Sequence, residues 1–327
     1  MYSDNNATKT DFNVFAKAMY SFNYRFHFFA DIQYRRVGYS FPGYNEMMVR
    51  SQQEATHKFI NLKAGVAFEP NSKNKIYASV AMGNKEPIRG DYINSTPQSR
   101  PRPEQMTDVE AGYRLTEARL RCGLNFYFMH YKDQLILTGQ INDVGDYTRM
   151  NVPSSYRSGL ELEAGFNLLK NLALYCNVTA SRNKISSFTE YVDDYNAGGQ
   201  QSIAHSNTDI AFSPSVIAAG GISWLPVKNF SVDLTTKYVG KQYLDNTGND
   251  ARKLDAYFLN DILLQYRFSF SCCKEIALKF AVYNLFDEKY ESNGYTYGYI
   301  YGGAPVQENF YYPQAGRNWL GGVTVGF

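Results

Sequence analysis

Hydrophobic and polar side chains alternate along this chain with a period of two residues. In residues 156–168, Leu160, Leu162 and Phe166 fall on one parity, while Glu161 and Glu163 fall on the other. Period two is the spacing of a β-strand, in which successive side chains point to opposite faces. One face of this strand is therefore apolar and the other is charged.

The same alternation recurs in other stretches of about ten residues, the length of a tilted strand that crosses a membrane. The pattern predicts about thirteen strands, near 12–23, 25–35, 58–69, 75–84, 105–116, 119–132, 155–168, 171–182, 214–225, 229–241, 256–269, 275–286 and 316–327. Short connectors alternate with long polar ones, which are predicted at 36–56, 85–104, 134–154, 184–212, 242–253 and 289–313. Short turns at one end and long loops at the other are typical of outer-membrane barrels.

Composition agrees with a strand-rich membrane protein. Apolar residues make up 44% of the 327 residues, yet charged residues are only 20%, and 28 Tyr and 22 Phe are present. Mean hydropathy is nevertheless −0.42, because each outward hydrophobic residue is offset by an inward polar neighbour. The 33 basic and 31 acidic residues are mixed along the chain, which gives no nucleic-acid footprint.

No apolar run approaches the roughly 18 residues of a membrane-spanning helix. The first ten residues, MYSDNNATKT, have neither the basic nor the apolar region of a secretory signal. We therefore predict an all-β transmembrane antiparallel β-barrel that lacks its own export signal. A soluble all-β sandwich also alternates, but its loops need not separate by length and its outer face would be polar.

The odd strand number matters because bacterial single-chain barrels have even numbers of strands. If the short turns face the periplasm, the last strand ends there and the first strand begins outside the cell. We therefore expect strands upstream of those counted here.

Several segments together resemble the TonB-dependent outer-membrane receptors, especially those of Bacteroides-like bacteria. The resemblance lies in VYNLFDEKY (282–290), the Tyr- and Gly-rich segment after it, the final strand that ends in Phe, and, in order, KIYASVAMGNKEP, RPRPEQMTDVEAGYR and FYFMHYKDQLILTGQ. It covers nearly the whole chain.

The resemblance implies that residues 1–327 form the C-terminal part of a barrel of about 22 strands, whose lumen an N-terminal plug fills. In this family, energy from the inner membrane reaches the plug through TonB, and the plug admits scarce ligands such as iron chelates, cobalamin or oligosaccharides. The resemblance does not imply an enzyme or a cofactor. Because plug and TonB-contacting segments are absent from the sequence, we expect no transport by this chain alone.

The C-terminal stretch GRNWLGGVTVGF places Trp319, Val323, Val325 and Phe327 on one parity. These residues resemble the C-terminal strand that the barrel-assembly machinery recognises. A closing strand also needs outward hydrophobic residues, so the same pattern fits a purely structural role.

The segment KYESNGYTYGYIYGGAPVQENFYYP is the main candidate for ligand contact. Its aromatic side chains offer flat rings for stacking and hydroxyl groups for hydrogen bonds, and the candidates are Tyr295, Tyr297, Tyr299, Tyr301 and Phe310. The alternative is a β-hairpin that extends beyond the membrane and carries ordinary interfacial aromatic residues.

No catalytic or metal site is predicted. Four histidines, His27, His57, His130 and His205, lie in separate segments without metal-ligand spacing. Cys122 and Cys176 are expected to face lipid on strands about 10 Å apart, which is too far for a disulfide. A bridge between the adjacent Cys272 and Cys273 would be strained, so all four cysteines are expected to be reduced.

Charged residues on the opposite parity are expected to line the lumen. These residues would guide a ligand, hold the plug, or simply form the water-exposed wall of a wide barrel. They are Arg157, Glu161, Glu163, Asp233 and Lys237.

Two alternatives to the receptor remain. A passive outer-membrane pore or adhesin would close with fewer strands, and an even strand count would favour it. An outer-membrane hydrolase would need a Ser, His and acid cluster, which the sequence does not show. For thirteen strands in a meander, the first and last run in the same direction, so we expect an open sheet or a strained barrel with an unpaired edge at 12–23.

The two parities predict different sensitivities to charge. Replacing Leu162 with Arg at mid-membrane is expected to cost about 2 to 4 kcal/mol of folding free energy, while Glu163→Arg costs little, because only Leu162 meets lipid. Urea unfolding in lipid vesicles measures both values. Equal losses at the two positions would contradict the barrel.

Overall fold

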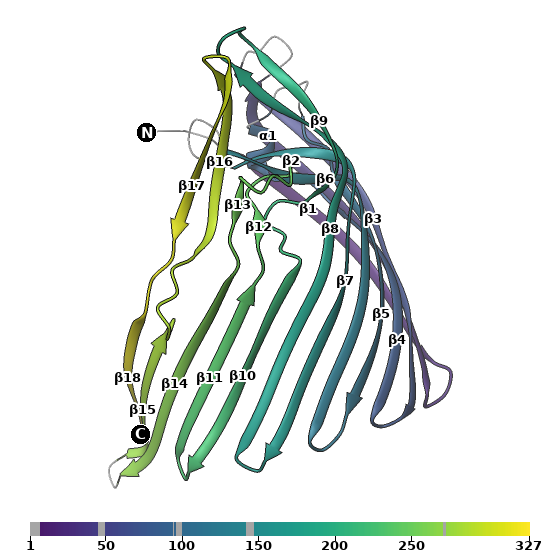
Figure 1. Ribbon diagram of the computed structural model, residues 1–327. Helices are drawn as coiled ribbons and strands as arrows, with labels where there is room; N and C mark the ends of the chain where they lie inside the picture. Colours follow the sequence, from purple (N-terminus) through teal and green to yellow (C-terminus); the bar gives the residue numbers. More distant parts are fainter. Residues whose placement is uncertain (1–6, 45–49, 94, 96–99, 142–146, 271–272) are drawn as a thin grey trace.

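The computed structural model describes residues 7–44, 50–93, 95, 100–141, 147–270 and 273–327. It consists of one large curved antiparallel sheet with long strands that slant across it (Figure 1). Thirteen strands form the continuous hydrogen-bonded path: β1 (Thr8–Ser21), β2 (Phe26–Tyr44), β3 (Arg50–Asn71), β4 (Asn74–Lys85), β5 (Glu104–Thr116), β6 (Leu120–Ile141), β7 (Tyr147–Leu169), β8 (Leu172–Asp194), β10 (Val216–Val227), β11 (Phe230–Val239), β14 (Tyr257–Phe270), β15 (Cys273–Tyr283) and β18 (Asn318–Gly326). The thirteen predicted strands correspond to this path, whereas the sheet as a whole contains 16 strands, three more than predicted.

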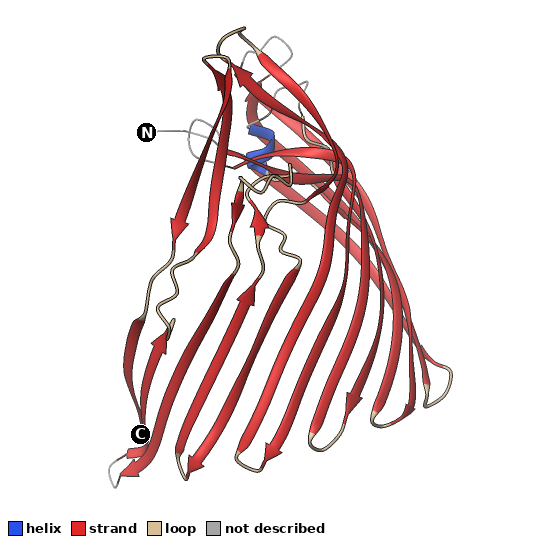
Figure 2. Ribbon diagram, in the orientation of Figure 1, coloured by secondary structure: helices blue, strands red, loops and turns tan. Residues whose placement is uncertain are grey.

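The remaining elements lie toward the end of the sheet where the connections are long, here called the loop end; the other end is the short-turn end. These elements are β9 (Gln200–Asp209), β12 (Gln242–Tyr243), β13 (Lys253–Leu254), β16 (Glu291–Tyr301), β17 (Ala304–Pro313) and the helix α1 (Arg89–Ile93). Figure 2 shows the helix, in blue, within the curve of the sheet near the loop end.

The strand registers confirm the two predicted faces. Leu162 lies opposite Leu124 on β6 and Val178 on β8, whereas Glu161 lies opposite Asn125 and Thr179. We call the first of these faces the apolar face and the second the polar face. Each strand of the path places alternate side chains on the apolar face and on the polar face. Both faces therefore extend across all the strands of the path.

The predicted long loops are partly wrong. Segments 36–56, 134–154, 184–212 and 289–313 are largely strand, because β2, β3, β6, β7 and β8 continue past the apolar face and β9, β16 and β17 add to them. The reason is physical: beyond a membrane the outer face of a strand meets water instead of lipid, so the strand no longer needs alternating hydrophobic residues to pair its backbone. The loops at 85–104 and 242–253 are correctly predicted in position and contain only short elements.

At the loop end, connections fold onto the polar face and bury a small core there. Tyr92 of α1 packs against Val37, Tyr39, Phe41 and Phe59 of β2 and β3, and all five side chains are at most 8% exposed. A second core joins β6, β7 and β8 to the segment after β9, and it contains Ile136, Val152, Ile185 and Ile210. The loop end is therefore held by tertiary packing, which the membrane-level part of the strands lacks.

The sheet does not close within the described residues. The path begins at β1, which pairs with β2, and ends at β18, which pairs with β15. Both edge strands run from the loop end toward the short-turn end, as the register of Ser21 with His27 and of Gly326 with Glu275 shows. This arrangement matches the expected open sheet.

Aromatic rings cover glycines on the polar face in a repeated arrangement. In each case the aromatic residue lies directly opposite the glycine on the next strand of the path, and the pairs are Phe29–Gly65, Tyr77–Gly112, Tyr127–Gly159 and Tyr175–Gly221. The hydroxyl of Tyr77 also donates a hydrogen bond to Asn125 Oδ1 at 2.9 Å. A ring this close to a glycine shields backbone that no side chain would otherwise cover.

Gly112→Ala tests this contact, because a Cβ at position 112 would overlap the ring of Tyr77. The ring must then move and lose its hydrogen bond, so unfolding free energy is expected to fall by about 1 to 2 kcal/mol. Gly165→Ala is the matched control, since no atom lies within 4 Å of a Cβ there. A loss at Gly165 as large as that at Gly112 would contradict the role of the ring.

Candidate functional site

The β8–β9 hairpin reaches the loop end and is shaped by one aspartate. Asp194 Oδ1 accepts hydrogen bonds from the backbone amides of Asn196 (2.9 Å) and Ala197 (3.0 Å). These amide hydrogen bonds, that of Ala197 first, hold the pKa of the Asp194 carboxyl below its usual value. Gly198 and Gly199 follow with φ angles of +76° and +85°, which glycine adopts without strain. The turn presents Tyr195 at the tip of the hairpin.

The β16–β17 hairpin, which carries the predicted ligand-contact residues, packs against that tip. The backbone amide of Tyr195 donates to Ile300 O at 3.0 Å, and the amide of Gly302 donates to Asn196 Oδ1 at 2.9 Å. β16 also pairs with β8 in parallel, with Tyr299 opposite Asp193. The two hairpins therefore form one unit, visible at the top of Figure 1.

The predicted aromatic residues separate into two groups and one exposed residue. Tyr295 and Phe310 lie opposite each other, and their rings stack with centroids 4.8 Å apart. Tyr297 and Tyr299 instead contact Tyr195: the Tyr195 and Tyr297 hydroxyls are 3.1 Å apart, and the Tyr195 and Tyr299 rings meet edge to face at 5.7 Å.

Tyr301 is 66% exposed, opposite Ala304 at the end of the hairpin. The hydrogen bond between the Tyr297 and Tyr195 hydroxyls, together with burial, raises the pKa of Tyr297 to about 12. The phenol of Tyr297 is thus neutral over the physiological range.

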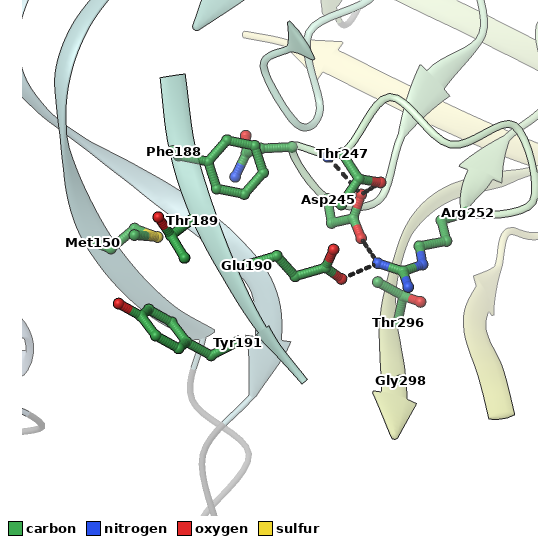
Figure 3. Close-up of a pocket in the computed structure, with 11 residues that line it drawn as sticks. Met150, Phe188, Thr189, Glu190, Tyr191, Asp245, Thr247, Arg252, Thr296 and Gly298 are labelled. Carbon is green, nitrogen blue, oxygen red and sulfur yellow. Dashed lines mark hydrogen bonds and ion pairs between the residues drawn. The ribbon is translucent and has the colours of Figure 1, made fainter. Parts of the chain in front are cut away.

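The opposite face of β16 lines a small polar pocket (Figure 3). Arg252 lines one side of it, and its Nη1 donates to Glu190 Oε1 at 2.5 Å and to Asp245 Oδ2 at 2.7 Å. His205 Nε2 lies 2.8 Å from Glu190 Oε2. We call the group His205, Glu190, Arg252 and Asp245 the loop junction, because it joins β8, β9 and the connection between β11 and β14.

Local structure explains how each member of the loop junction is placed. The Asp245 carboxylate also accepts from the backbone amide of Thr247 at 3.0 Å and from its hydroxyl at 2.7 Å, which closes a turn in the loop. Gly298 of β16 leaves room for the guanidinium, since a Cβ there would lie 3.3 Å from Arg252 Nη2. The contacts of Asp245 shape its own connection, and the ion pair of Arg252 with Glu190 joins that connection to β8.

The electrostatics of the loop junction favour the charged arginine. Burial by itself would lower the pKa of Arg252, but the hydrogen bonds that Arg252 donates to Glu190 and Asp245 outweigh it and raise the pKa. Arg252 and Glu190 are each 15% exposed and Asp245 is 5% exposed, so water screens these ion pairs weakly. The hollow beside them has a volume of about 90 Å³, too small for a nutrient-sized ligand. The loop junction therefore serves to fasten the loops.

A larger hollow of about 590 Å³ opens on the polar face below the loop junction, and we call it the wall hollow. Arg157 of β7 crosses it and donates to Asn183 Oδ1 (3.3 Å) and Ser213 Oγ (3.0 Å). The other residues that line it include Glu110, Asn125, Tyr127, Glu161, Thr179 and Ser181. Its charged and hydroxyl groups can offer hydrogen bonds to a polar partner in the lumen.

The C-terminal residues predicted as an assembly signal lie on the apolar face. Trp319, Val323 and Val325 are opposite Val282, Leu278 and Ile276 of β15. Phe327 follows the last residue of β18 and is 83% exposed. Their position agrees with outward hydrophobic residues on an edge strand, and their recognition by assembly machinery stays a prediction.

The histidines make ordinary polar contacts. His57 Nε2 lies 2.5 Å from the Tyr92 hydroxyl, His27 Nδ1 lies 2.9 Å from Ser21 Oγ and His130 Nε2 lies 3.1 Å from Ser154 Oγ. In the part of the chain that the structure describes, no group of three or more His, Cys, Asp or Glu side chains is arranged to hold a metal ion.

Cys122 and Cys176 are free thiols on β6 and β8, each opposite Ala164 of β7. Cys272 lies outside the described residues.

In the part of the chain that the structure describes, no helix is long and apolar enough to cross a membrane.

Comparison with known proteins identifies the family. Residues 1–285 match the family model of the TonB dependent receptor-like β-barrel. The chain belongs to this family. Its members are outer-membrane proteins of Gram-negative bacteria, bind a small ligand and interact with TonB, and they are receptors and transporters, not enzymes.

Individual relatives agree with this assignment. The chain is 27% identical over 253 residues to the vitamin B12 transporter BtuB of Photobacterium profundum, a match that covers 76% of this chain and 36% of BtuB. The siderophore receptor PiuA of Acinetobacter baumannii superposes with a TM-score of 0.75 at 15% identity, over 98% of this chain and 43% of PiuA. The ferric yersiniabactin uptake receptor FyuA of Yersinia pestis gives a TM-score of 0.67 at 17% identity, over 98% of this chain and 45% of FyuA. The chain thus spans less than half the length of these relatives.

Sequence reasoning missed the loop junction of this receptor barrel. Glu190 and Arg252 are 62 residues apart, and Asp245 lies in a polar loop that resembles any other polar loop. The available signal was weak: isolated charges within the predicted loops 184–212 and 242–253. Tyr195 was missed for the same reason, since its partners Tyr297 and Tyr299 follow it by about a hundred residues.

Arg252→Met is expected to release the loops of the receptor barrel. The change leaves Glu190 and Asp245 as buried carboxylates without their cation, which costs about 3 kcal/mol. Lys241→Met is the matched control, because Lys241 pairs with the 70% exposed Asp250 on the same loop and such pairs contribute about 0 to 1 kcal/mol. Hydrogen exchange of the backbone amides in 244–254 measures both. Equal protection in the two variants would contradict the role of the loop junction.

Proposed function

We propose that this chain forms the barrel wall of an outer-membrane receptor that takes up a scarce nutrient by energy-coupled transport. The observation that carries the proposal is a receptor-family sheet whose polar face holds both the wall hollow and the fastened loops above it. A ligand captured at the loop end would meet this polar wall on its way through the lumen.

The functions of similar proteins support an iron chelate or cobalamin as the nutrient, and the oligosaccharide class is added from the family resemblance alone. These proteins include a vitamin B12 transporter, receptors for ferric yersiniabactin and ferric catecholates, a siderophore receptor, a copper transporter and a ferric citrate transporter. We infer that the ligand is an iron chelate, cobalamin or an oligosaccharide, and that no enzymatic step is involved.

We infer further that this wall alone does not transport. Because β1 and β18 both run toward the short-turn end, an antiparallel closure needs an odd number of strands between them. A barrel of about 22 strands would need about nine. A second copy in the same membrane orientation would bring β18 beside β1 in parallel, so it does not supply that closure.

The partners follow from the same geometry. A plug would contact the wall hollow through Arg157 and Glu161, and TonB would act on this receptor only through that plug. Membrane lipid would cover the apolar face. The barrel-assembly machinery would recognise Trp319, Val323, Val325 and Phe327 on β18, where the unpaired edge leaves backbone groups available for strand addition.

The proposed ligand contacts can be ranked by their geometry. The rings of Tyr295 and Phe310 already stack on each other. The better candidates are the exposed Tyr301 and the cluster of Tyr195, Tyr297 and Tyr299, of which Tyr195 is 59% exposed. Their rings lie on the face of β16 opposite Thr296 and Gly298, so a ligand would contact them on the side of β16 that faces away from the loop junction.

Uptake by cells with and without this protein tests the proposal. Deleting it from its host is expected to abolish uptake of one radiolabelled nutrient from a panel of ferric chelates, cobalamin and oligosaccharides. A protonophore is expected to abolish the same uptake in the undeleted host, because energy coupling requires the inner-membrane gradient. Uptake of a small unrelated sugar serves as the control and is expected to stay unchanged.

The opposite outcome would favour a passive pore. Nutrient entry that depends on this protein but ignores the protonophore would contradict energy coupling. The isolated chain in a planar bilayer gives a second readout, in which a steady discrete conductance would show closure without further strands. The open edges at β1 and β18 predict no such conductance.

A further inference from the structure

Two basic residues face each other on the apolar face close to the loop end. Arg36 of β2 lies directly opposite Lys58 of β3, and both side chains are exposed. Like charges directly opposite each other destabilise a strand pair. Among the described residues neither forms an ion pair with a carboxylate, while Arg35 on the other face pairs with both Asp11 and Glu86. Within the described residues the pair is therefore left without a compensating negative charge.

The position of this pair is unusual for a charge. Arg36 and Lys58 share the parity of Ile32, Ile60 and Leu62, which belong to the apolar face. They therefore point away from the lumen, at the level where hydrocarbon gives way to headgroups. Basic side chains at that level attract anionic lipid headgroups.

The apolar face of β1 to β4 also carries an apolar hollow of about 620 Å³, which lies toward the middle of these strands. We call it the lipid-side hollow. Small side chains create it, because Ala18, Ala30 and Ala64 lie side by side on β1, β2 and β3. Larger apolar side chains border it, namely Ile32, Leu62, Val80 and Met82. On β6 and β7, by contrast, the apolar face is filled by Leu124, Phe126, Leu160 and Leu162.

The spacing between the two features matches a lipid. Arg36 and Ala30 are six residues apart on β2, as are Lys58 and Ala64 on β3, which corresponds to about 20 Å along a strand. A tilted strand covers somewhat less along the membrane normal, and half of the hydrocarbon core is about 15 Å thick. An acyl chain that descends from a headgroup at Arg36 and Lys58 would therefore end in the lipid-side hollow.

We propose that β1 to β4 bind one phosphorylated lipid of the outer leaflet, with its phosphate between Arg36 and Lys58 and an acyl chain in the lipid-side hollow. The inference rests on the outer-membrane placement given under the proposed function, but not on the nutrient. The planar guanidinium of Arg36 offers a forked pair of donors to phosphate oxygens, and Lys58 adds a second charge. The lipid compensates the like-charge pair and fills the hollow at once.

Lipid binding to charge variants tests the phosphate site. The chain is folded in detergent with lipid A, and native mass spectrometry counts the lipid that stays bound. R36Q/K58Q is expected to lower the affinity about thirtyfold. K170Q/K228Q, which removes two exposed charges from short turns, is expected to bind like the unmodified chain. Removing the phosphates from lipid A is expected to lower affinity for the unmodified chain by a similar factor, and adding inorganic phosphate is expected not to displace the lipid.

A substitution in the hollow tests the acyl site separately. A64L fills the lipid-side hollow and is expected to weaken lipid A binding about tenfold, while A164L on the apolar face of β7 has no effect. Only variants with the unmodified circular dichroism spectrum are compared, so misfolding does not imitate loss of binding. Unchanged affinity in R36Q/K58Q, or equal affinity for dephosphorylated lipid A, would overturn the proposal. Success or failure here does not depend on nutrient uptake, which the preceding experiment measures.

Discussion

The requirement that every backbone polar group find a partner inside a membrane governs this molecule. Water is absent there, so the strands must satisfy one another, and each strand does so along the whole path from β1 to β18. Period-two alternation then follows, because a strand paired on both edges exposes its side chains to two different solvents. Leu162 and Glu163 are neighbours in sequence yet belong to opposite surfaces. The open ends of the path are the one place where this requirement is not met among the described residues.

Beyond the membrane level, backbone groups no longer have to pair with one another, and the strands are held in place by other interactions. Water can satisfy backbone groups at the loop end, so strands there need tertiary contacts to hold a fixed arrangement. The two small cores around Tyr92 and around Ile185 provide some of them. The loop junction provides another, through an arginine that binds Glu190 of β8 and Asp245 of its own connection. Arg252 therefore joins the connection between β11 and β14 to the β8–β9 hairpin.

Sequence alone was sufficient for features that depend on local periodicity. The thirteen strands and their two faces could be predicted because each strand repeats the same rule within about ten residues, as Leu160 to Phe166 do. Features that depend on long-range contacts could not. The strand extensions through 134–154 and 184–212 carry no regular alternation, because their outer face meets water and their inner face is covered by other connections. The pairing of Arg252 with Glu190, and of Tyr195 with Tyr297, depends on how two loops meet in space.

The tyrosine-rich segment 289–313 shows, within one strand, what alternation can and cannot predict. Alternation correctly predicted that one side of β16 carries Tyr295, Tyr297, Tyr299 and Tyr301. It could not predict what that side would contact. The other side, with Thr296 and Gly298, faces the loop junction instead. A pattern of period two therefore separates two faces without saying which one faces the lumen at the loop end.

Accessibility along β7 tests the two-solvent account most directly. Spin labels placed singly at positions 160 to 163 in lipid vesicles report collisions with dissolved oxygen, which enters lipid, and with a water-soluble nickel complex. The account predicts that positions 160 and 162 collide mainly with oxygen and that positions 161 and 163 collide mainly with nickel, with a period of two. A uniform response at all four positions, or a period of 3.6, would contradict it.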